Sequence, residues 1–531
     1  TTPATDRTTT PGPVTAADGQ AGPGTAASPP ADPTAATSTR VTNAPDVTGR
    51  PAAGNGDAVP DSPDDPDGVG DSLFPGLGNP GIDVQHYDLD LTYDHATTIV
   101  DADVSIDIRF TERREEFTLD SDGPSIDAVT IDGHAAQFRV DDAELRVSPG
   151  AAIAAGTNAT VDVRYHFTGD SSRKSAGLPI GWFNTVGGSY ALNEPDGARF
   201  WFPSNDHPSD KATYRFTIHV PAGVTGVANG ALESHTTTTA GETWVWDQDE
   251  PMTTYLIQVL TGDYEIIDGT GPHGLPLTSV VLRSDKARLM PLIDGISDQI
   301  TELEQFFGPF PLERYGLAIS DMPPDVAMET QGRSLFSDQA LSGDMRRDGP
   351  VLAHELTHQW FGDAVSPQRW SDVWLNESFA TYGEWLWSSN NFGLGGPQTV
   401  QNRADVALGS RSPGKTADPT LAELFGSDVY DGGAVAVHAL RLEIGDGKFF
   451  ALLQQWVGDN EGASRNTTDF IALASKVAGT DLTDFFHDWV YSGVVPRNFP
   501  RMPPAPPVPA ETVTSIVTAT VTSTVTSTTG G

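Results

Sequence analysis

Hydrophobic and polar residues follow two different periods along the chain. Between about residues 82 and 265 apolar residues alternate with polar ones, and separate runs end at turn-forming stretches such as "IDGH" and "SPG". Alternation with a period of two is typical of strands that bury one face. The pattern predicts an N-terminal antiparallel β-sandwich or saddle domain over residues 81–268. Its clearest runs are Tyr87, Leu89, Leu91 and Tyr93; Val104, Ile106, Ile108 and Phe110; Val161, Val163, Tyr165 and Phe167; and Tyr214, Phe216, Ile218 and Val220.

From about residue 285 the period becomes helical, as in "LMPLIDGISDQITELEQFF", "GPVLAHELTHQWFG" and "LTDFFHDWV". Apolar residues three or four positions apart indicate amphipathic helices. We therefore predict a second, mostly helical domain over residues 269–500. In the helix that contains "AHELTH", we expect Pro350 in the first turn, Asp348 as the N-terminal cap and Gly362 at the end.

Both ends of the chain have a different composition. Residues 1–80 are rich in Thr, Pro, Ala and Asp, and residues 501–531 form a Pro-rich spacer followed by Thr, Ser and Val repeats. Such segments have too few apolar groups to offset the entropy cost of ordering, so we predict that both are disordered. The Val and Thr alternation near the C-terminus leaves an edge strand as the alternative. Flanks of this type are common in exported proteins, and the chain starts at Thr1 without Met, so we expect a secreted or cell-surface protein whose leader has been removed.

The charge of the chain excludes several classes of partner. Its 531 residues include 72 acidic and 31 basic ones, which gives a formal net charge of -41. A surface this anionic repels nucleic acid and anionic lipid, so neither is expected as a partner. The chain has no cysteine, which excludes disulfides, thiol catalysis and Cys-ligated zinc. No apolar run reaches the length of about 18 residues that a membrane-spanning helix needs. We also expect the protein to be a monomer.

A possible metal site starts at "VLAHELTHQWFGD", residues 351–363. His354 and His358 are four positions apart, so on a helix they share one face and can bind one zinc ion. Catalytic zinc has three protein ligands and an open position for water. Glu377 follows His358 after eighteen residues, at the start of another apolar-periodic helix, and is the candidate third ligand. Glu355 would lie beside the metal rather than on it.

The longer stretch "VLAHELTHQWFGDAVSPQRWSDVWLNESFATY" resembles the zinc site of the aminopeptidase N family of gluzincin metallopeptidases. The resemblance implies a thermolysin-like, mostly helical α+β catalytic domain behind the β domain, with one zinc ion per chain. It also implies that His354, His358 and Glu377 are the zinc ligands and Glu355 is the general base. The expected activity is hydrolysis of the N-terminal bond of peptides that have a free N-terminus.

Three further segments resemble the same family. "VAMETQ", residues 326–331, is similar to its Gly-Ala-Met-Glu-Asn stretch, which implies that Glu329 holds the α-ammonium group of the substrate and that Ala327 and Met328 bind substrate. "VYDGGAVAVHALR" implies that Tyr430 stabilises the oxyanion. "NEPDGARFWFPSNDHP" implies that Glu194 is a second carboxylate for the amine.

Several positions depart from the family pattern. Val326 replaces a glycine that touches the substrate backbone, and Leu192 replaces a glutamine. The sequence also ends before the large helical C-terminal domain of many members, so we expect a more open cleft. The changes at Val326 and Leu192 leave one alternative, a gluzincin that cleaves internally or releases dipeptides. A second alternative, in which the two tails are stalks, is a surface-displayed binding module with a non-catalytic zinc site.

Two more polar residues lie on the apolar helices. We expect His438 to be a hydrogen-bonded core residue and not a ligand. Glu384 is seven residues after Glu377 and therefore on the same helix face, where it either supports a ligand histidine or has no part in the site.

Overall fold

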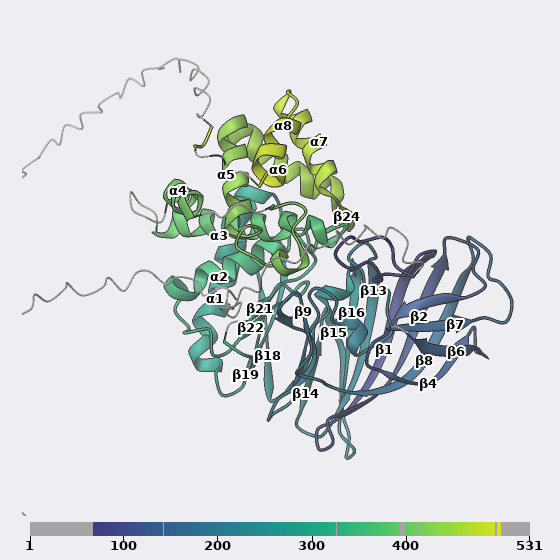
Figure 1. Ribbon diagram of the computed structural model, residues 1–531. Helices are drawn as coiled ribbons and strands as arrows, with labels where there is room; N and C mark the ends of the chain where they lie inside the picture. The colour runs from purple at the N-terminus through teal and green to yellow at the C-terminus, as the bar shows by residue number, and fades with distance from the viewer. Residues whose placement is uncertain are drawn as a thin grey trace, which may run out of the picture. The chain divides into compact units, whose positions relative to one another are not determined.

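The computed structural model describes residues 67–500, apart from 142, 325, 393–398, 411–414, 494, 495 and 497. All of these residues belong to one compact unit of the chain, Thr39–Gly531. The predictions of disorder for residues 1–66 and 501–531 lie outside the described residues. Figure 1 shows the arrangement of the helices and strands.

The first domain is built on a sheet of eight strands in the order β15-β16-β13-β1-β2-β8-β4-β5. The residues predicted to face the core do so: Leu89, Val104 and Val163, for example, are at most 1% exposed. All neighbouring strands pair antiparallel except β1 and β13, which are parallel. The strands are β1 (Ile82–Asp94), β2 (Ile99–Phe110), β4 (Ser125–Ile131), β5 (His134–Ala135), β8 (Asn158–Thr168), β13 (Ala212–Val220), β15 (Ala231–Thr237) and β16 (Glu242–Met252).

The predicted β domain is therefore confirmed, with the direction of one strand pair corrected. Alternation of apolar residues gives the buried face of a strand but not the direction of its neighbour. Parallel neighbours need a long connection between them, and here strands β2 to β12 lie between β1 and β13 in the chain. The first domain also contains three smaller sheets. These consist of β11 (Gly181–Asn184), β12 (Ser189–Leu192), β17 (Val259–Gly262) and β14 (Thr225–Ala228); of β3 (Phe117–Asp120), β7 (Glu144–Ser148) and β6 (Gln137–Asp141); and of β9 (Lys174–Ser175) and β10 (Leu178–Pro179).

The second domain combines a five-stranded sheet, in the order β18-β19-β20-β22-β21, with helices. The predicted domain boundary at 268/269 falls inside β18, which pairs with β19 in this sheet. Among the described residues no helix is both long and apolar enough to cross a membrane. The elements are β18 (Tyr264–Thr270), β19 (Pro276–Leu282), β20 (Leu317–Ser320), β21 (Ala327–Met328), β22 (Ser334–Ser337), β23 (Val365–Pro367), β24 (Ala463–Arg465), α1 (Lys286–Phe307), α2 (Met345–His358), α3 (Trp374–Phe392), α4 (Val400–Ser410), α5 (Asp431–Ile444), α6 (Asp446–Asn460), α7 (Thr467–Ala478) and α8 (Thr483–Phe486).

Helix α2 begins earlier than its sequence predicts. Its cap is Asp344, whose carboxylate accepts a hydrogen bond from the Arg346 backbone N–H at 2.9 Å. Asp348 lies inside the helix, where its carboxylate accepts hydrogen bonds from the backbone N–H groups of Ser342 and Gly343. The expected cap thus binds the turn that precedes the helix. Pro350 is consequently inside the helix and not in its first turn.

Residues 67–80, which the composition places in the disordered segment, contact both domains. Asp71 is 2% exposed, and its carboxylate accepts a hydrogen bond from the Trp370 backbone N–H at 2.8 Å. The same carboxylate lies 3.2 Å from Nε2 of the buried His207. Leu77 and Phe74 of the same segment also pack in the core, and the overall composition of the segment does not indicate such partners.

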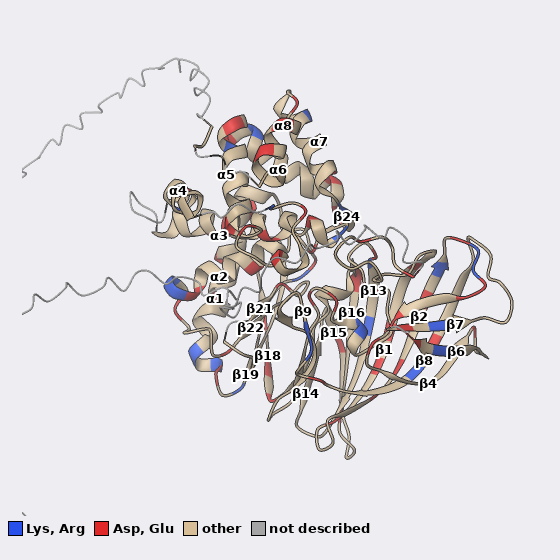
Figure 2. Ribbon diagram, in the orientation of Figure 1, with Lys and Arg blue, Asp and Glu red and all other residues tan. Residues whose placement is uncertain are grey.

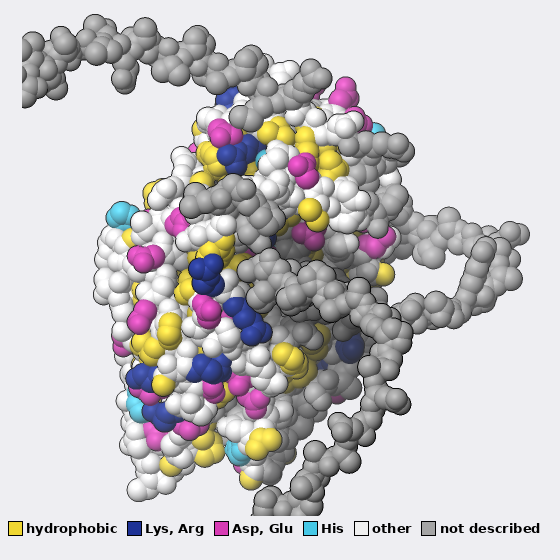
Figure 3. All heavy atoms as spheres, turned by 90° about the vertical axis from the view of Figure 1, so that its left-hand side faces the viewer, with side chains coloured by type: hydrophobic (Ala, Val, Ile, Leu, Met, Phe, Trp, Pro, Cys, Tyr) yellow, Lys and Arg dark blue, Asp and Glu magenta, His cyan; other side chains and the backbone are white. Residues whose placement is uncertain are grey.

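Charged residues are distributed unevenly along this fold. Figure 2 shows several acidic residues in α2 and α3. On the face drawn in Figure 3, the described Lys and Arg side chains are interspersed with acidic and apolar ones.

Arg333 joins the two domains through a buried network. Its guanidinium donates hydrogen bonds to the backbone oxygens of Thr278 in the second domain and of Ala228 and Gly230 in the first, at 2.7–3.2 Å. The side chain also lies over the Trp246 ring, 5.0 Å from its centroid. At 1% exposure, this arginine satisfies carbonyl groups that water does not reach.

Replacing Arg333 with methionine should lower the free energy of unfolding by about 3 kcal/mol or more, because each buried carbonyl left without a donor costs about 1–3 kcal/mol. Urea denaturation measures the change. Arg283→Met is the control: the Arg283 side chain is 53% exposed, and its loss should have much less effect. Equal effects of the two substitutions would contradict the proposed role of Arg333.

Candidate metal centre and amine-binding site

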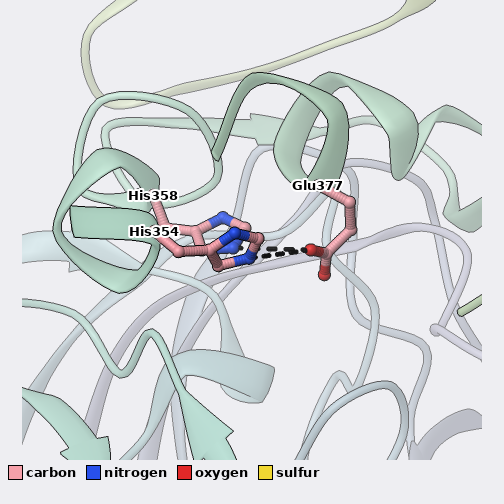
Figure 4. Close-up of side chains that lie close together, drawn as sticks. All are labelled: His354, His358 and Glu377. Carbon is pink, nitrogen blue, oxygen red and sulfur yellow. Dashed lines mark ion pairs between the residues drawn. The ribbon is translucent and has the colours of Figure 1, made fainter. Parts of the chain in front are cut away.

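Helices α2 and α3 bring two histidines and a glutamate together, as Figure 4 shows. His354 and His358 lie on the same face of α2, with ring centroids 4.9 Å apart. The Nε2 atoms of both rings face the same oxygen of Glu377, Oε2, at 3.4 Å and 3.5 Å. Glu377 lies in the first turn of α3. The structure therefore brings together the three residues that the sequence selects as ligands.

The second nitrogen of each ring has its own polar neighbour. The Nδ1 atom of His358 is 3.1 Å from the backbone oxygen of Phe361, so it can donate its proton there. The Nδ1 atom of His354 is 3.9 Å from Glu384 Oε2. A proton on Nδ1 leaves the Nε2 lone pair available to a metal. The turn after α2 is tight: a Cβ on Gly362, which has φ of 133°, would lie 3.4 Å from His358 Nδ1.

The three side chains fit one zinc ion. One ligand atom from each lies within 4.8 Å of the other two, and all three residues are buried. Two imidazole nitrogens and one carboxylate are a usual ligand set for catalytic zinc. Glu377 Oε2 has no hydrogen-bond partner among the described residues, although it is buried between the histidines. A cation at this point would satisfy it.

The charges of the site act on these same groups. Burial alone would raise the pKa of the Glu377 carboxyl, but His358 and His354 together bring that pKa well below its usual value. Burial likewise opposes the protonation of His358, but Glu329 and Glu377 raise its pKa well above the usual value. Positive charge is thus stabilised between these side chains.

Two more carboxylates lie beside the metal ligands. Oxygens of Glu194, Glu329 and Glu377 lie within 4.8 Å of one another. The Oε1 atoms of Glu194 and Glu329 are buried and have no hydrogen-bond partner among the described residues. Burial raises the pKa of both carboxyls, and for Glu194 the neighbouring Glu329 adds to the effect. The pair therefore needs a positively charged partner or a proton.

The backbone around these carboxylates is held by hydrogen bonds. Glu329 follows the edge strand β21, and Gln359 Nε2 donates to its backbone oxygen at 3.1 Å. Because Gln359 comes directly after His358, this hydrogen bond connects the Glu329 backbone to the end of the helix that contains the metal ligands His354 and His358. Glu194 follows Asn193, whose Nδ2 donates to the Ile257 backbone oxygen at 2.8 Å. Glu194 thus reaches the site from the first domain.

The predicted catalytic residues lie next to the metal ligands. Ligand atoms of Glu355, Glu329 and His358 lie within 4.8 Å of one another. Tyr430 precedes helix α5, and its ring is stacked on that of His354, with centroids 6.1 Å apart. Both side chains therefore lie beside the metal ligands.

The remaining predicted residues differ in exposure. Met328 is 4% exposed and packs in the core, whereas Ala327 and Val326 are partly exposed. Within β21, Ala327 is therefore the more accessible to substrate. His438 has the buried, hydrogen-bonded position that its helix predicts: Nδ1 is 3.0 Å from the Tyr382 hydroxyl, and burial lowers its pKa to about 4.

Sequence reasoning did not select Asp363 and Lys211. Asp363 is fully buried, and burial together with the charge of Glu329 raises its pKa well above the usual value. In the sequence Asp363 follows "WFG", and this position predicts an ordinary turn residue. Lys211 Nζ, in the first domain, donates to the Asp363 backbone oxygen at 2.6 Å, and burial lowers the pKa of this lysine to about 7. No short-range pattern connects two residues that are 152 positions apart.

The same fold and site occur in known proteins. Residues 297–489 match the model of the peptidase family M1 domain, and residues 83–256 match that of the peptidase M1 N-terminal domain. The crystal structure of the M1 zinc metallopeptidase from Deinococcus radiodurans is 30% identical, with a TM-score of 0.74, and the match covers 83% of this chain and 100% of that one. The chain belongs to the M1 family of zinc metallopeptidases.

Other relatives extend the comparison. A mutant of the Deinococcus radiodurans protein bound to a Tyr-Ser-Ala substrate has a TM-score of 0.73 and 30% identity over 82% of this chain and 100% of that one. "Probable aminopeptidase 2" of Sulfurisphaera tokodaii is 24% identical, and "Leucyl aminopeptidase" of Saccharolobus solfataricus is 26% identical; each match covers 77% of this chain and 53% of the relative. The chain thus spans about half the length of these two relatives.

The purified protein should contain one zinc ion per chain, and His358→Ala or Glu377→Ala should bring the zinc content close to zero, because two ligands do not retain the ion. Mass spectrometry for metals, after dialysis at a fixed free-zinc concentration, measures the content. His219→Ala is the control, since His219 is on strand β13 of the first domain. Full zinc content in either ligand variant would rule out this site.

Proposed function

We propose that the protein is a zinc-dependent aminopeptidase that removes the N-terminal residue of peptides. The observation that carries the proposal is the position of Glu194 and Glu329. Their carboxylates lie within 4.8 Å of the metal ligand Glu377, in buried surroundings that favour a cation. An α-ammonium group bound there would place the first peptide bond next to the metal.

His354, His358 and Glu377 would hold the zinc ion, which would polarise a water and lower its pKa towards about 7. Glu355, which lies next to His358, would accept a proton from that water and donate it to the departing amine. The Tyr430 hydroxyl, on the ring stacked against His354, would donate a hydrogen bond to the oxyanion that develops on the scissile carbonyl.

The amine site explains why one residue would be removed at a time. The Oε1 atoms of Glu194 and Glu329 have no hydrogen-bond donor among the described residues, and an ammonium group has three N–H donors. If the substrate had further residues on the N-terminal side, its ammonium group would not reach the two buried carboxylates. Their charge would then be uncompensated, which is costly. Strand β21 is an edge of its sheet, so an extended substrate can pair with it.

Secretion and a monomeric state remain part of the proposal. The Thr- and Pro-rich composition of residues 1–80 and 501–531 and the net charge of -41 support an extracellular location. The acidic composition also opposes self-association at low ionic strength.

Glu355→Gln should retain zinc but lower kcat by about 100-fold to 10,000-fold, because the amide does not accept the proton of the water. Hydrolysis of an amino-acid amide measures kcat, and the metal content of the same sample shows that the site is intact. A variant as active as the wild type would show that the mechanism is wrong and would favour the alternative of a non-catalytic zinc site.

A peptide with a free N-terminus should be cleaved at least about 100-fold more efficiently than its N-acetylated form, and Glu329→Gln should raise KM for the free peptide about 10-fold to 100-fold. Loss of a hydrogen bond between charged groups costs about 1.5–3 kcal/mol, which gives that range. The ratio of kcat/KM for the two peptides is the measurement. Efficient cleavage of the acetylated peptide would favour an internally cleaving gluzincin instead.

A further inference from the structure

The imidazole of His354, on helix α2, lies between two glutamates of helix α3. Its Nε2 faces Glu377 at 3.4 Å, and its Nδ1 faces Glu384 at 3.9 Å. The second distance is longer than a hydrogen bond, so at this separation Glu384 acts through its charge. Negative charge near Nδ1 favours the proton on that nitrogen and leaves Nε2 for the metal.

The two ligand histidines are oriented by different kinds of group. His358 Nδ1 faces a backbone oxygen, that of Phe361, whose position is set by the turn after α2. His354 instead faces a side chain, which can rotate. Glu384 therefore needs a partner that holds its carboxylate against the ring.

Arg403 of helix α4 is that partner. Its NH1 donates a hydrogen bond to Glu384 Oε1 at 2.8 Å, the oxygen that does not face His354. The Glu384 side chain is only 7% exposed, so its charge requires a nearby cation. Helix α4 is in turn attached to α5, because Ala404 is fully buried and His438 Nε2 lies 3.1 Å from Gln401 Oε1.

We propose that Arg403 is a positioning residue for the metal centre: it holds Glu384 so that His354 presents Nε2 to zinc. The role is indirect, since Arg403 reaches the metal only through two side chains. The inference rests on the proposed function only in taking zinc as the metal. It goes further by making a helix outside the ligand set, α4, part of what determines zinc affinity.

The test measures the dissociation constant for zinc by competition with a chelator, without any peptide. Arg403→Gln should weaken binding about tenfold, the lower end of the range for groups that orient a metal ligand. Arg403→Lys should restore most of the affinity, because a cation still faces Glu384. Glu384→Gln should weaken binding at least as much. The double variant should bind zinc no more weakly than Glu384→Gln alone, since Arg403 acts through that residue.

Two controls separate positioning from general stability. Asp405→Asn changes a charge on the same helix at an exposed position and should leave zinc affinity unchanged. The melting temperature of the zinc-free protein should be similar in wild type and Arg403→Lys. Unchanged zinc affinity in Arg403→Gln would overturn the proposal, as would an equal further loss when Arg403→Gln is added to Glu384→Gln. Absence of zinc binding in the wild type would instead refute the proposed function.

Discussion

The concentration of buried negative charge beside two histidines is the constraint on which the site depends. Burying carboxylates is costly unless a cation or hydrogen-bond donors compensate them. Burial raises the pKa of the Glu194, Glu329 and Asp363 carboxyls, so a nearby cation would stabilise their charged forms. A metal ion and the ammonium group of a peptide are the cations that fit, so the same electrostatic imbalance favours both the cofactor and the substrate.

The scaffold serves this constraint by joining two domains at the site. Glu194 comes from the first domain, whereas the metal ligands lie on α2 and α3 of the second. Hydrogen bonds of Arg333 and Lys211 cross between the domains close to these elements. The proposed amine site therefore depends on the contact between the two domains, which these buried cationic side chains stabilise. Arg403 extends the same principle to α4, where a cation stabilises a carboxylate that faces a metal ligand.

Local patterns predicted the parts of the protein that depend on local geometry. Alternation identified the buried faces of β1, β2, β8 and β13, and the spacing of His354 and His358 places both rings on one helix face. The pairing of β1 with β13 was not predictable, because alternation is the same for both directions. Asp71 and Arg403 were missed for a related reason: each acts on residues outside its own local segment, Asp71 on Trp370 and His207 and Arg403 on Glu384. The cap Asp344 was missed because Asp348 is an equally good cap by sequence alone.

The most direct test of the central claim is the identity of the products from one unmodified peptide. A decapeptide with ten different residues would be incubated with the zinc-loaded protein, and mass spectrometry would follow the products over time. Binding of the amine by Glu194 and Glu329 predicts a ladder of peptides, each shorter by one N-terminal residue, together with free amino acids. Internal fragments or released dipeptides from the earliest time points would contradict the claim that these carboxylates bind the substrate amine one residue from the metal.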